Sequence, residues 1–240
     1  MLRTLIALSA AFCAVLPMPA DAQTCQTRSG ATPPLVVELY TSEGCSSCPP
    51  ADRWLSTLRG RADVLPLAFH VTYWDRLGWP DRFAAKAHTE RQHEIEQRAG
   101  SRQVYTPQVL ADGQDWRRWP ALPALRQWAA APGLSLQRQG DRVSALVAPQ
   151  PQGAARLAGY WAVLEDGHAS RVAKGENAGE TLRHDHVVRL YQPVALWAAT
   201  AGATMSLQVS RGVAEHPRRV AFVVTDAASG RPLQALALAC

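Results

Sequence analysis

Residues 35–50 of this 240-residue chain read LVVELYTSEGCSSCPP. The run 35–40 is mostly apolar and rich in β-branched residues, which is typical of a buried strand. The two prolines at the end suit only the first turn of a helix, and apolar residues then recur at helical spacing over 51–58. The stretch therefore predicts a Cys-x-x-Cys motif, Cys45 to Cys48, placed between a buried strand and a helix.

The sequence downstream continues the alternation of strands and helices. The predicted elements are a buried strand at 64–71, a mostly polar surface helix from an N-cap at Asp81 to Gly100, a strand at 106–110 with a hairpin turn at 112–113, and a short helix at 121–130. This order predicts an α/β unit with a parallel-containing sheet covered by helices, over residues 23–131.

The remaining residues, 132–240, have a different character. Short alternating strands are predicted at 134–138, 143–148, 160–165, 184–191, 205–209 and 220–225. Turn signals separate them, as in a small β-sandwich or open barrel. We expect an all-β, sandwich-like domain here, with the boundary near Pro132.

Residues 1–22 have the features of a cleavable secretory signal. One basic residue, Arg3, precedes an apolar run at 5–16, and small residues follow at 20–22. The apolar run is shorter than the roughly 18 residues that a membrane-spanning helix needs, and no later stretch approaches that length. We expect a periplasmic or secreted protein without stable membrane insertion.

The charge distribution argues against nucleic-acid binding. The formal net charge is +5, but the basic residues are scattered and form only short pairs such as Arg117 with Arg118. A nucleic-acid-binding surface would show a clustered basic stripe. We therefore expect no nucleic-acid partner.

Four cysteines remain after signal removal: Cys25, Cys45, Cys48 and Cys240. Disulfides persist in exported proteins, so an even number suggests pairing. The close pair leaves Cys25 and Cys240, near the two mature ends, as each other's natural partners. Two unpaired thiols remain the alternative, because sequence does not fix connectivity.

The position of the cysteine pair indicates redox chemistry. A thiol at a helix N-terminus has a lowered pKa, because the helix dipole and free N–H groups favour the thiolate. We therefore expect Cys45 to be the attacking nucleophile and Cys48, one helical turn inward, to resolve the mixed disulfide.

The Cys-x-x-Cys after one strand and Thr106-Pro107 before another resemble the thioredoxin superfamily. The resemblance implies a thioredoxin-like first domain in which Pro107 is cis and faces the cysteines. It further implies that Thr106 offers backbone contacts to the substrate. Aligning residues 37–40 with the thioredoxin strand, with one extra residue before the motif, implies that Glu38 is a buried carboxylate able to exchange a proton with Cys48.

Longer phrases resemble a bacterial family of exported thioredoxin-like proteins without an assigned function. They are LYTSEGCSSCPPAD at 39–52, HVTYWD at 70–75, TERQ at 89–92, VYTPQ at 104–108 and GENAG at 175–179. The resemblance covers nearly all of the mature chain. It implies the fold and export and supplies no substrate.

Several histidines and aromatic residues have more than one interpretation. On a strand at 184–191, His184 and His186 would share one face and could bind a metal or pack at a domain junction. His70 at a strand end could approach the cysteines or only bond nearby backbone, and His88 and His93 are expected in solvent.

An aromatic segment follows the second predicted strand. Tyr73, Trp74 and Trp79 could line a substrate groove, with Tyr73 and Trp74 as binding residues, or form a hydrophobic cap over the sheet. The sequence alone favours neither arrangement.

The favoured hypothesis is a thiol–disulfide oxidoreductase that exchanges a disulfide through Cys45 and Cys48 with a protein or small-thiol client. Under this hypothesis the protein could also act with a redox partner protein, and it would need no cofactor or metal. One alternative is a binding module with a structural disulfide. Another is a copper- or zinc-handling protein that uses Cys45, Cys48 and a histidine such as His184.

Overall fold

The computed structural model describes residues 24–101, 103–125 and 131–240. The predicted signal peptide at 1–22 lies outside these residues, as does the second half of the helix predicted at 121–130. Residues 121–125 are not helical. Among the described residues, no helix is long and apolar enough to cross a membrane.

The described residues form mainly β-structure, with two α-helices and two short 3₁₀ helices, η1 (Asp75–Leu77) and η2 (Ala199–Ala201). The α-helices are α1 (Pro49–Ser56) and α2 (Lys86–Arg98). The strands are β1 (Thr24–Arg28), β2 (Leu35–Thr41), β3 (Val64–His70), β4 (Gln108–Ala111), β5 (Gln114–Asp115), β6 (Leu134–Gln139), β7 (Arg142–Val147), β8 (Arg156–Glu165), β9 (His168–Arg171), β10 (Thr181–His184), β11 (Val187–Ala198), β12 (Ala203–Gln208), β13 (Arg218–Asp226) and β14 (Pro232–Ala239).

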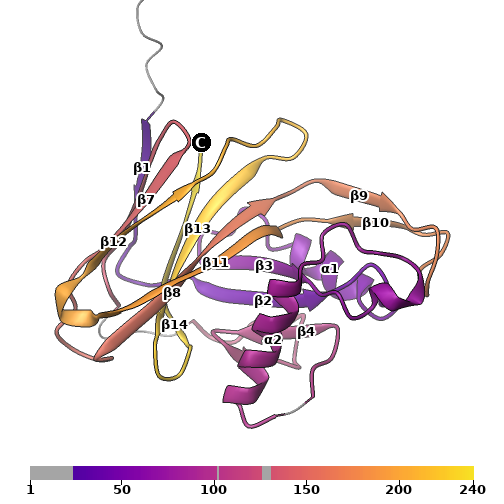
Figure 1. The fold of residues 1–240 in the computed structure, drawn as a ribbon, viewed down its shortest axis with the longest axis horizontal. Helices are drawn as coiled ribbons and strands as arrows, with labels where there is room; N and C mark the ends of the chain where they lie inside the picture. The colour runs from indigo at the N-terminus through magenta and orange to yellow at the C-terminus, as the bar shows by residue number, and fades with distance from the viewer. Residues whose placement is uncertain (1–23, 102, 126–130) are drawn as a thin grey trace, which may run out of the picture.

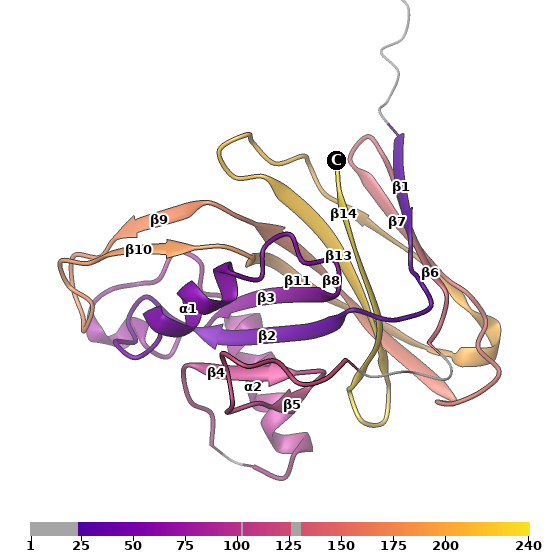
Figure 2. The same ribbon diagram turned by 180° about the vertical axis from the view of Figure 1, so that it is seen from behind.

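The strands form three sheets. An eight-stranded sheet has the order β14-β13-β8-β11-β3-β2-β4-β5, a four-stranded sheet has the order β1-β6-β7-β12, and β9 pairs with β10. Within the large sheet β2 is parallel to β3, and β3 is parallel to β11 through the pair Ala68 and Val187. Strands from both sides of Pro132 therefore lie in one sheet (Figures 1 and 2).

Strand β2 is buried along its whole length because a helix covers each of its faces. Val37 and Leu39 pack with Leu55 of α1, whereas Tyr40 packs in the cluster that includes Ile95 of α2. Figure 1 shows α2 in front of the sheet, and Figure 2, from behind, shows α1 in front. Residues that alternate along β2 thus enter two different environments.

The four-stranded sheet packs on the large sheet, on the same face as α1. Leu136 and Val143 of the small sheet share a core with Trp161 and Phe222 of the large one. Strands β6 and β7 show alternating burial, as expected where one face meets a core and the other meets solvent. The packing is compatible with the predicted sandwich-like, β-rich second part.

A disulfide joins Cys25 in β1 to Cys240 at the carboxyl end of the chain. Of the two alternatives left open by the sequence, the structure contains the paired one. Figure 1 shows the carboxyl end beside β1. The bond therefore links the small sheet to the last strand of the large sheet.

Helix α2 differs from its prediction in its start and in its buried face. It begins at Lys86 with Ala85 as its N-cap, so Asp81 is not the cap. Its buried residues are His88, Gln92 and Glu96, which are polar and spaced at i, i+4 and i+8. The expectation that His88 lies in solvent is wrong, whereas His93 is exposed as expected.

A polar ladder explains how a helix buries this face. The Gln92 amide donates hydrogen bonds to the Tyr105 carbonyl at 2.9 Å and to Gln108 Oε1 at 2.8 Å. Gln108 in turn donates to Glu96 Oε1 at 2.7 Å. Buried polar groups are tolerated when they are paired in this way. The buried face of α2 is polar, so the spacing of apolar residues in the sequence does not reveal it.

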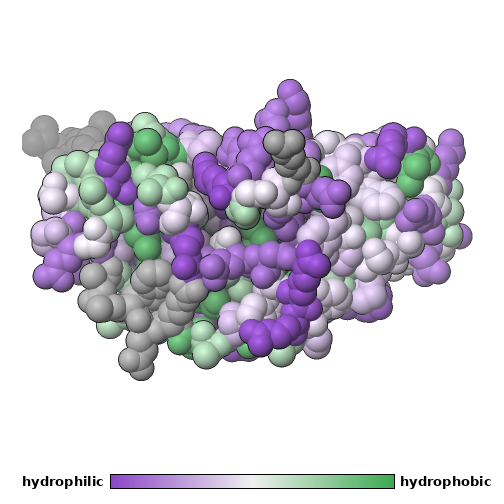
Figure 3. All heavy atoms as spheres, turned by 90° about the horizontal axis from the view of Figure 1, so that it is seen from below, coloured by the Kyte–Doolittle hydropathy of each residue, from purple (hydrophilic) through white to green (hydrophobic). Residues whose placement is uncertain are grey.

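The outer surface lacks a broad apolar area on the face seen from below in Figure 3. Hydrophilic residues cover most of that face, and hydrophobic ones form small separate groups. The exposed large apolar residues of the described chain are also dispersed: Leu77, Leu125, Leu146, Leu196 and Val213. Isolated apolar residues are ordinary on protein surfaces.

A buried ion pair connects α2 to β2. Arg91 lies against Glu38 with side chains only 10% and 2% exposed. Glu38 also accepts hydrogen bonds from the hydroxyl groups of Tyr40 at 2.9 Å and Tyr160 at 2.8 Å. The Arg91 guanidinium lies 4.3 Å from the centre of the Tyr160 ring. The charges are therefore compensated inside the core.

We predict that Arg91→Met lowers the free energy of unfolding by about 3–5 kcal/mol, because it leaves an ionised Glu38 buried without a partner. Adding Glu38→Gln should recover part of this loss, since the amide oxygen still accepts the tyrosine hydrogen bonds. Urea denaturation measures both values. Lys86→Met on the same helix is the control, with an expected effect within about 0.5 kcal/mol because Lys86 is 86% exposed. An equal loss in the single and double variants would contradict the argument.

Candidate functional site

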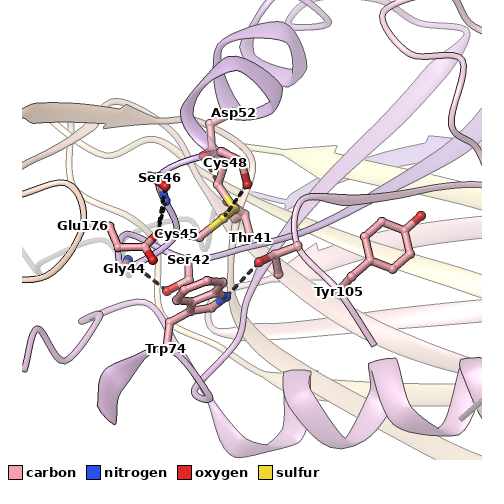
Figure 4. Close-up of a disulfide and its surroundings, with 12 residues drawn as sticks. Thr41, Ser42, Gly44, Cys45, Ser46, Cys48, Asp52, Trp74, Tyr105 and Glu176 are labelled. Atoms are coloured by element: carbon pink, nitrogen blue, oxygen red, sulfur yellow. Dashed lines mark hydrogen bonds between the residues drawn. A yellow bond between two sulfur atoms is a disulfide. The ribbon is translucent and has the colours of Figure 1, made fainter. Parts of the chain in front are cut away.

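The candidate site begins in the loop that joins β2 to α1. Cys45 and Cys48 form a disulfide there (Figure 4). Cys48 is the N-cap residue of α1, and Pro49 and Pro50 occupy the first turn as expected. The sequence predicts that Cys45 lies at the start of the helix and Cys48 one turn further inward. This prediction is wrong. Cys48 holds the helix start, and Cys45 lies three residues before it.

The disulfide is fully covered but lies among polar groups. Cys45 and Cys48 are both 0% exposed. The Cys45 sulfur lies 3.4 Å from the Ser47 hydroxyl oxygen. The backbone N–H of Cys45 donates to the Ser42 carbonyl at 3.1 Å, and the N–H of Gly44 donates to the Ser42 hydroxyl at 3.1 Å. These bonds fix the loop that presents Cys45.

Part of the cover comes from the distant segment 175–179, which lies between β9 and β10. The Asn177 amide donates to the carbonyl oxygens of Glu43 at 2.8 Å and Cys45 at 3.0 Å. The Glu176 carboxylate accepts bonds from the Ser46 N–H at 3.0 Å and hydroxyl at 2.8 Å (Figure 4). Sequence analysis noted this segment only within a resemblance and assigned no role to Glu176 or Asn177.

Trp74 connects the cysteine loop to the predicted substrate position. A Cβ on Gly44 would lie 3.0 Å from the Trp74 Cβ, so a larger residue would fit only if Trp74 shifted. The Trp74 indole N–H donates to the Thr106 hydroxyl at 2.8 Å. The peptide bond between Thr106 and Pro107 is cis, as the resemblance implies. Trp74 thus joins the two predicted parts of the site.

The other aromatic residues of this segment also make internal contacts. The Tyr73 hydroxyl donates to Gln92 Oε1 at 3.3 Å, and burial raises the Tyr73 pKa to about 12. The Trp79 indole donates to Glu43 Oε2 at 2.7 Å. Tyr73 and Trp79 are half-buried, as is Trp74. They have the contacts expected of a cap, and each retains some exposed surface.

Two buried histidine–carboxylate pairs lie behind the cysteine loop. His70 at the end of β3 pairs with Asp81 at 2.6 Å, and His184 at the end of β10 pairs with Glu43 at 3.2 Å. The two imidazole rings lie edge to face, with centres 4.9 Å apart. The structure thus brings His70 and His184 together, although they are 114 positions apart in the sequence.

The pairing shifts the pKa values of Asp81, His70 and Glu43. Burial alone would raise the pKa of Asp81, but His70 and the backbone N–H groups of Glu43 and Phe83 lower it to about 2. Burial opposes a charged His70, yet Asp81 outweighs it and raises the His70 pKa. For Glu43, burial is likewise outweighed by hydrogen bonds from His184 and Trp79, and the pKa is lowered.

Asp52 is the buried carboxyl group that sequence analysis overlooked. It lies one turn after Cys48 on α1, and its backbone N–H donates to the Cys48 carbonyl at 3.1 Å. Its carboxyl group accepts a hydrogen bond from the Thr41 hydroxyl at 3.0 Å (Figure 4). Burial is the main cause of its raised pKa. An aspartate within the first turn of an amphipathic helix is usually exposed, so the sequence carried no signal of this placement.

The predicted role of Glu38 beside Cys48 needs correction. Glu38 lies in the ion pair with Arg91, on the face of β2 opposite α1, whereas Val37 and Leu39 face α1. The alignment that suggested this role contained one extra residue. A shift of one residue moves a strand side chain to the other face of the sheet, which accounts for the error.

The expected strand at 184–191 is interrupted. β10 ends at His184 and β11 begins at Val187, while His186 has a φ of 58°. His184 and His186 therefore do not share a strand face. His186 Nδ1 accepts a hydrogen bond from Arg219 at 2.7 Å, away from the His70–His184 pair. Both histidines are buried and hydrogen-bonded, as the packing interpretation expected.

Comparison with known proteins identifies the family of this chain. The family model described as a protein of unknown function, DUF1223, matches residues 36–225. The chain belongs to the DUF1223 family. A search of the curated proteins finds no match.

Two solved structures are similar to this chain. The crystal structure of a protein from Agrobacterium tumefaciens is 27% identical, with a TM-score of 0.63, and the match covers 88% of this chain and 96% of that one. HBP35 of Porphyromonas gingivalis is 13% identical, with a TM-score of 0.54, and the match covers 88% and 76%. The second likeness concerns the fold alone.

We predict that Asn177→Ala accelerates reduction of the Cys45–Cys48 disulfide by dithiothreitol. The change removes two hydrogen bonds that hold segment 175–179 over Cys45. At roughly 0.5–1.5 kcal/mol each, their loss should increase opening, and hence the reduction rate, about fivefold or more. Quenched alkylation and mass spectrometry measure the rate. Glu180→Gln, an exposed change in the same connection, should leave it unchanged, and equal rates in all three proteins would refute the covering role.

Proposed function

We propose that this chain is an exported thiol–disulfide oxidoreductase that exchanges a disulfide through Cys45 and Cys48 with a protein or small-thiol client. The observation that carries the proposal is the position of the disulfide. It lies in the loop between the buried strand β2 and α1, with Cys48 as the helix N-cap, among hydroxyl, amide and carboxylate groups. A purely structural bridge needs no such surroundings. Export, to the periplasm or outside the cell, rests on the signal-like residues 1–22.

The layout of residues 35–111 supports a thioredoxin-like architecture for this part. Parallel strands β2 and β3 are joined through α1, which covers one face of the sheet. Helix α2 then covers the opposite face, and β4 returns antiparallel to β2. Thr106 and Pro107 lead into β4, where Trp74 connects them to the cysteine loop. The same superfamily suggested these positions from the sequence.

The exchange proceeds in two balanced steps. A client thiolate attacks the Cys45 sulfur, which forms a mixed disulfide and releases Cys48 as a thiolate that takes up a proton. A second client thiol, after losing its proton, attacks the client sulfur of the mixed disulfide and releases Cys45. The client dithiol is oxidised to a disulfide, and the Cys45–Cys48 disulfide is reduced to two thiols. The reverse sequence reduces a client disulfide.

We infer that segment 175–179 controls access to Cys45. Cys45 is 0% exposed, Asn177 donates to its carbonyl oxygen, and Glu176 accepts from the N–H of the next residue, Ser46. When these bonds open, the Ser47 hydroxyl, 3.4 Å from the Cys45 sulfur, is placed to donate a hydrogen bond to the thiolate. The segment thus limits which clients reach the sulfur.

The full burial of both cysteines favours a second candidate, a binding module with a structural disulfide. In that case Cys45 and Cys48 would only fix the loop beside the half-buried Trp74. The two candidates differ in one measurable property. A structural disulfide resists reduction, whereas a reactive one is reduced at a potential accessible in the cell envelope.

The second disulfide, Cys25–Cys240, is an internal reference for measuring the reduction potential of Cys45–Cys48. We predict that Cys45–Cys48 is reduced at a potential above about −300 mV, the range of reactive disulfides, and that Cys25–Cys240 is reduced only below it. Equilibration with dithiothreitol redox buffers, followed by alkylation and mass spectrometry, gives both potentials in one sample. Reduction of Cys45–Cys48 only below about −300 mV would eliminate the oxidoreductase and leave the binding module.

Variants of the two cysteines test their separate roles. With a dithiol peptide as client, Cys45→Ser should abolish disulfide exchange, because the attacked sulfur is absent. Cys48→Ser, mixed with an activated peptide disulfide, should accumulate a mixed disulfide through Cys45, because the resolving thiol is missing. The Cys25→Ser/Cys240→Ser double variant is the control and should retain exchange. Trapping through Cys48 in the Cys45→Ser variant would reverse the assignment.

A further inference from the structure

A second cluster of potential ligand groups lies behind the disulfide. Asp52 from α1, His70 from β3 and His184 from β10 are all buried. Each offers one ligand atom, and these three atoms lie within 4.8 Å of one another. We propose that Asp52, His70 and His184 form a binding site for a zinc ion. The site is separate from the Cys45 and Cys48 sulfurs and requires no thiolate.

Each histidine has one ring nitrogen engaged and one free. His70 Nδ1 pairs with Asp81 and His184 Nε2 with Glu43, whereas His70 Nε2 and His184 Nδ1 have no hydrogen-bond partner among the described residues. A metal-binding histidine usually has its other nitrogen held by a carboxylate or a carbonyl. Both histidines show that arrangement. A buried ring nitrogen without a partner is otherwise unfavourable.

The dimensions of the cluster suit a small ion after modest adjustment. Zinc binds nitrogen and oxygen ligands at about 2.0–2.2 Å in a tetrahedral arrangement, so its ligand atoms lie about 3.3–3.6 Å apart. The three protein atoms need to approach by about an ångström. The Thr41 hydroxyl holds one Asp52 oxygen at 3.0 Å and leaves the other free to bind. Rotation of the imidazole rings can supply the remaining movement.

The charge around the cluster also favours a cation. Three carboxyl groups, Asp52, Asp81 and Glu43, surround the two imidazoles, and all three are buried. Among the described residues, no Lys or Arg forms an ion pair with these three groups. Asp81 and Glu43 are paired with His70 and His184, so Asp52 is the carboxyl group whose ionised form a bound divalent ion would compensate.

A cavity of about 120 Å³ provides a route to the site. Asp52 and His184 lie on its wall, together with Pro49 and Leu182. The exposed Arg53 and Arg183 also line it. The cavity can hold an ion and a water molecule but is small for an organic ligand. Water from this side would supply the fourth zinc ligand, as in sites with three protein ligands.

The zinc content and affinity of the oxidised mature protein test this proposal. We expect one equivalent of zinc per chain with both disulfides intact, measured by competition with a chromophoric chelator. Asp52→Asn and His184→Gln should each weaken the affinity at least about tenfold. Asp52→Asn keeps an oxygen that accepts the Thr41 bond, so the helix should fold normally.

His168→Gln is the matched control. His168 is also buried, pairs with Glu165 at 3.1 Å and has a ring nitrogen without a partner among the described residues, but it is not in the cluster. Its replacement should leave the zinc affinity unchanged.

Cobalt replacement gives a readout that does not depend on variants. The oxidised wild-type protein with cobalt should show the visible absorption of tetrahedral nitrogen and oxygen ligands, without a sulfur charge-transfer band. Three results would overturn the proposal. They are the absence of stoichiometric zinc, equal affinity in the wild-type, Asp52→Asn and His184→Gln proteins, and binding that occurs only after reduction, with a sulfur band.

Discussion

The short parallel pairing between β3 and β11 is the constraint on which the site depends. Its register places Val187 beside Ala68, and the Ala68 N–H donates to the His186 carbonyl at 2.8 Å. This pairing joins the part of the chain before Pro132 to the part after it. Because β10 directly precedes β11, the pairing brings His184 to His70, and the β9–β10 connection then reaches Cys45. A change of register here would separate both contacts.

The same pairing explains why so many polar groups are buried around the cysteine loop. The carboxylates of Glu43 and Asp81 come from loops of the first part, while His184 and Asn177 come from the second. Each group alone would be costly to bury, but together they are hydrogen-bonded or ion-paired. The compensation is possible only after the two parts have joined. We therefore regard the polar cluster as a product of the whole chain and not of either half.

Local pattern was a good guide to the elements that hold the cysteines. The apolar run 35–40 predicted β2, and the two prolines predicted the start of α1. It was a poor guide where burial depends on a partner. The polar face of α2 is buried because Gln92 finds Gln108 and Tyr105, and no helical periodicity reports such a match. The sequence thus located β2 and the start of α1 but gave no sign of the partners that bury α2.

The site residues divide in the same way. The spacing of Cys45 and Cys48 indicates the motif, and the sequence also indicates Trp74 and Thr106, whose side chains are hydrogen-bonded in the structure. Glu38 was assigned to the wrong face, because a single inserted residue reverses the direction of a strand side chain.

The residues that sequence analysis missed have a common cause. Asp52, Glu176 and Asn177 look like ordinary surface residues in the sequence. They gain their roles from contacts across the β3–β11 junction or with the end of β2. Long-range topology was the missing information, and it is set by a few residues of strand pairing.

The cysteine loop is covered differently on its Cys45 side and on its Asp52 side. The difference affects which molecules could reach each side. On the Cys45 side, Glu176 and Asn177 bond to the loop backbone, so a client must displace a segment of chain. On the Asp52 side, a cavity of about 120 Å³ already reaches Asp52 and His184. In the proposed exchange, a protein client would need the first route, whereas an ion can use the second. Because the routes differ, occupation of one does not by itself block the other.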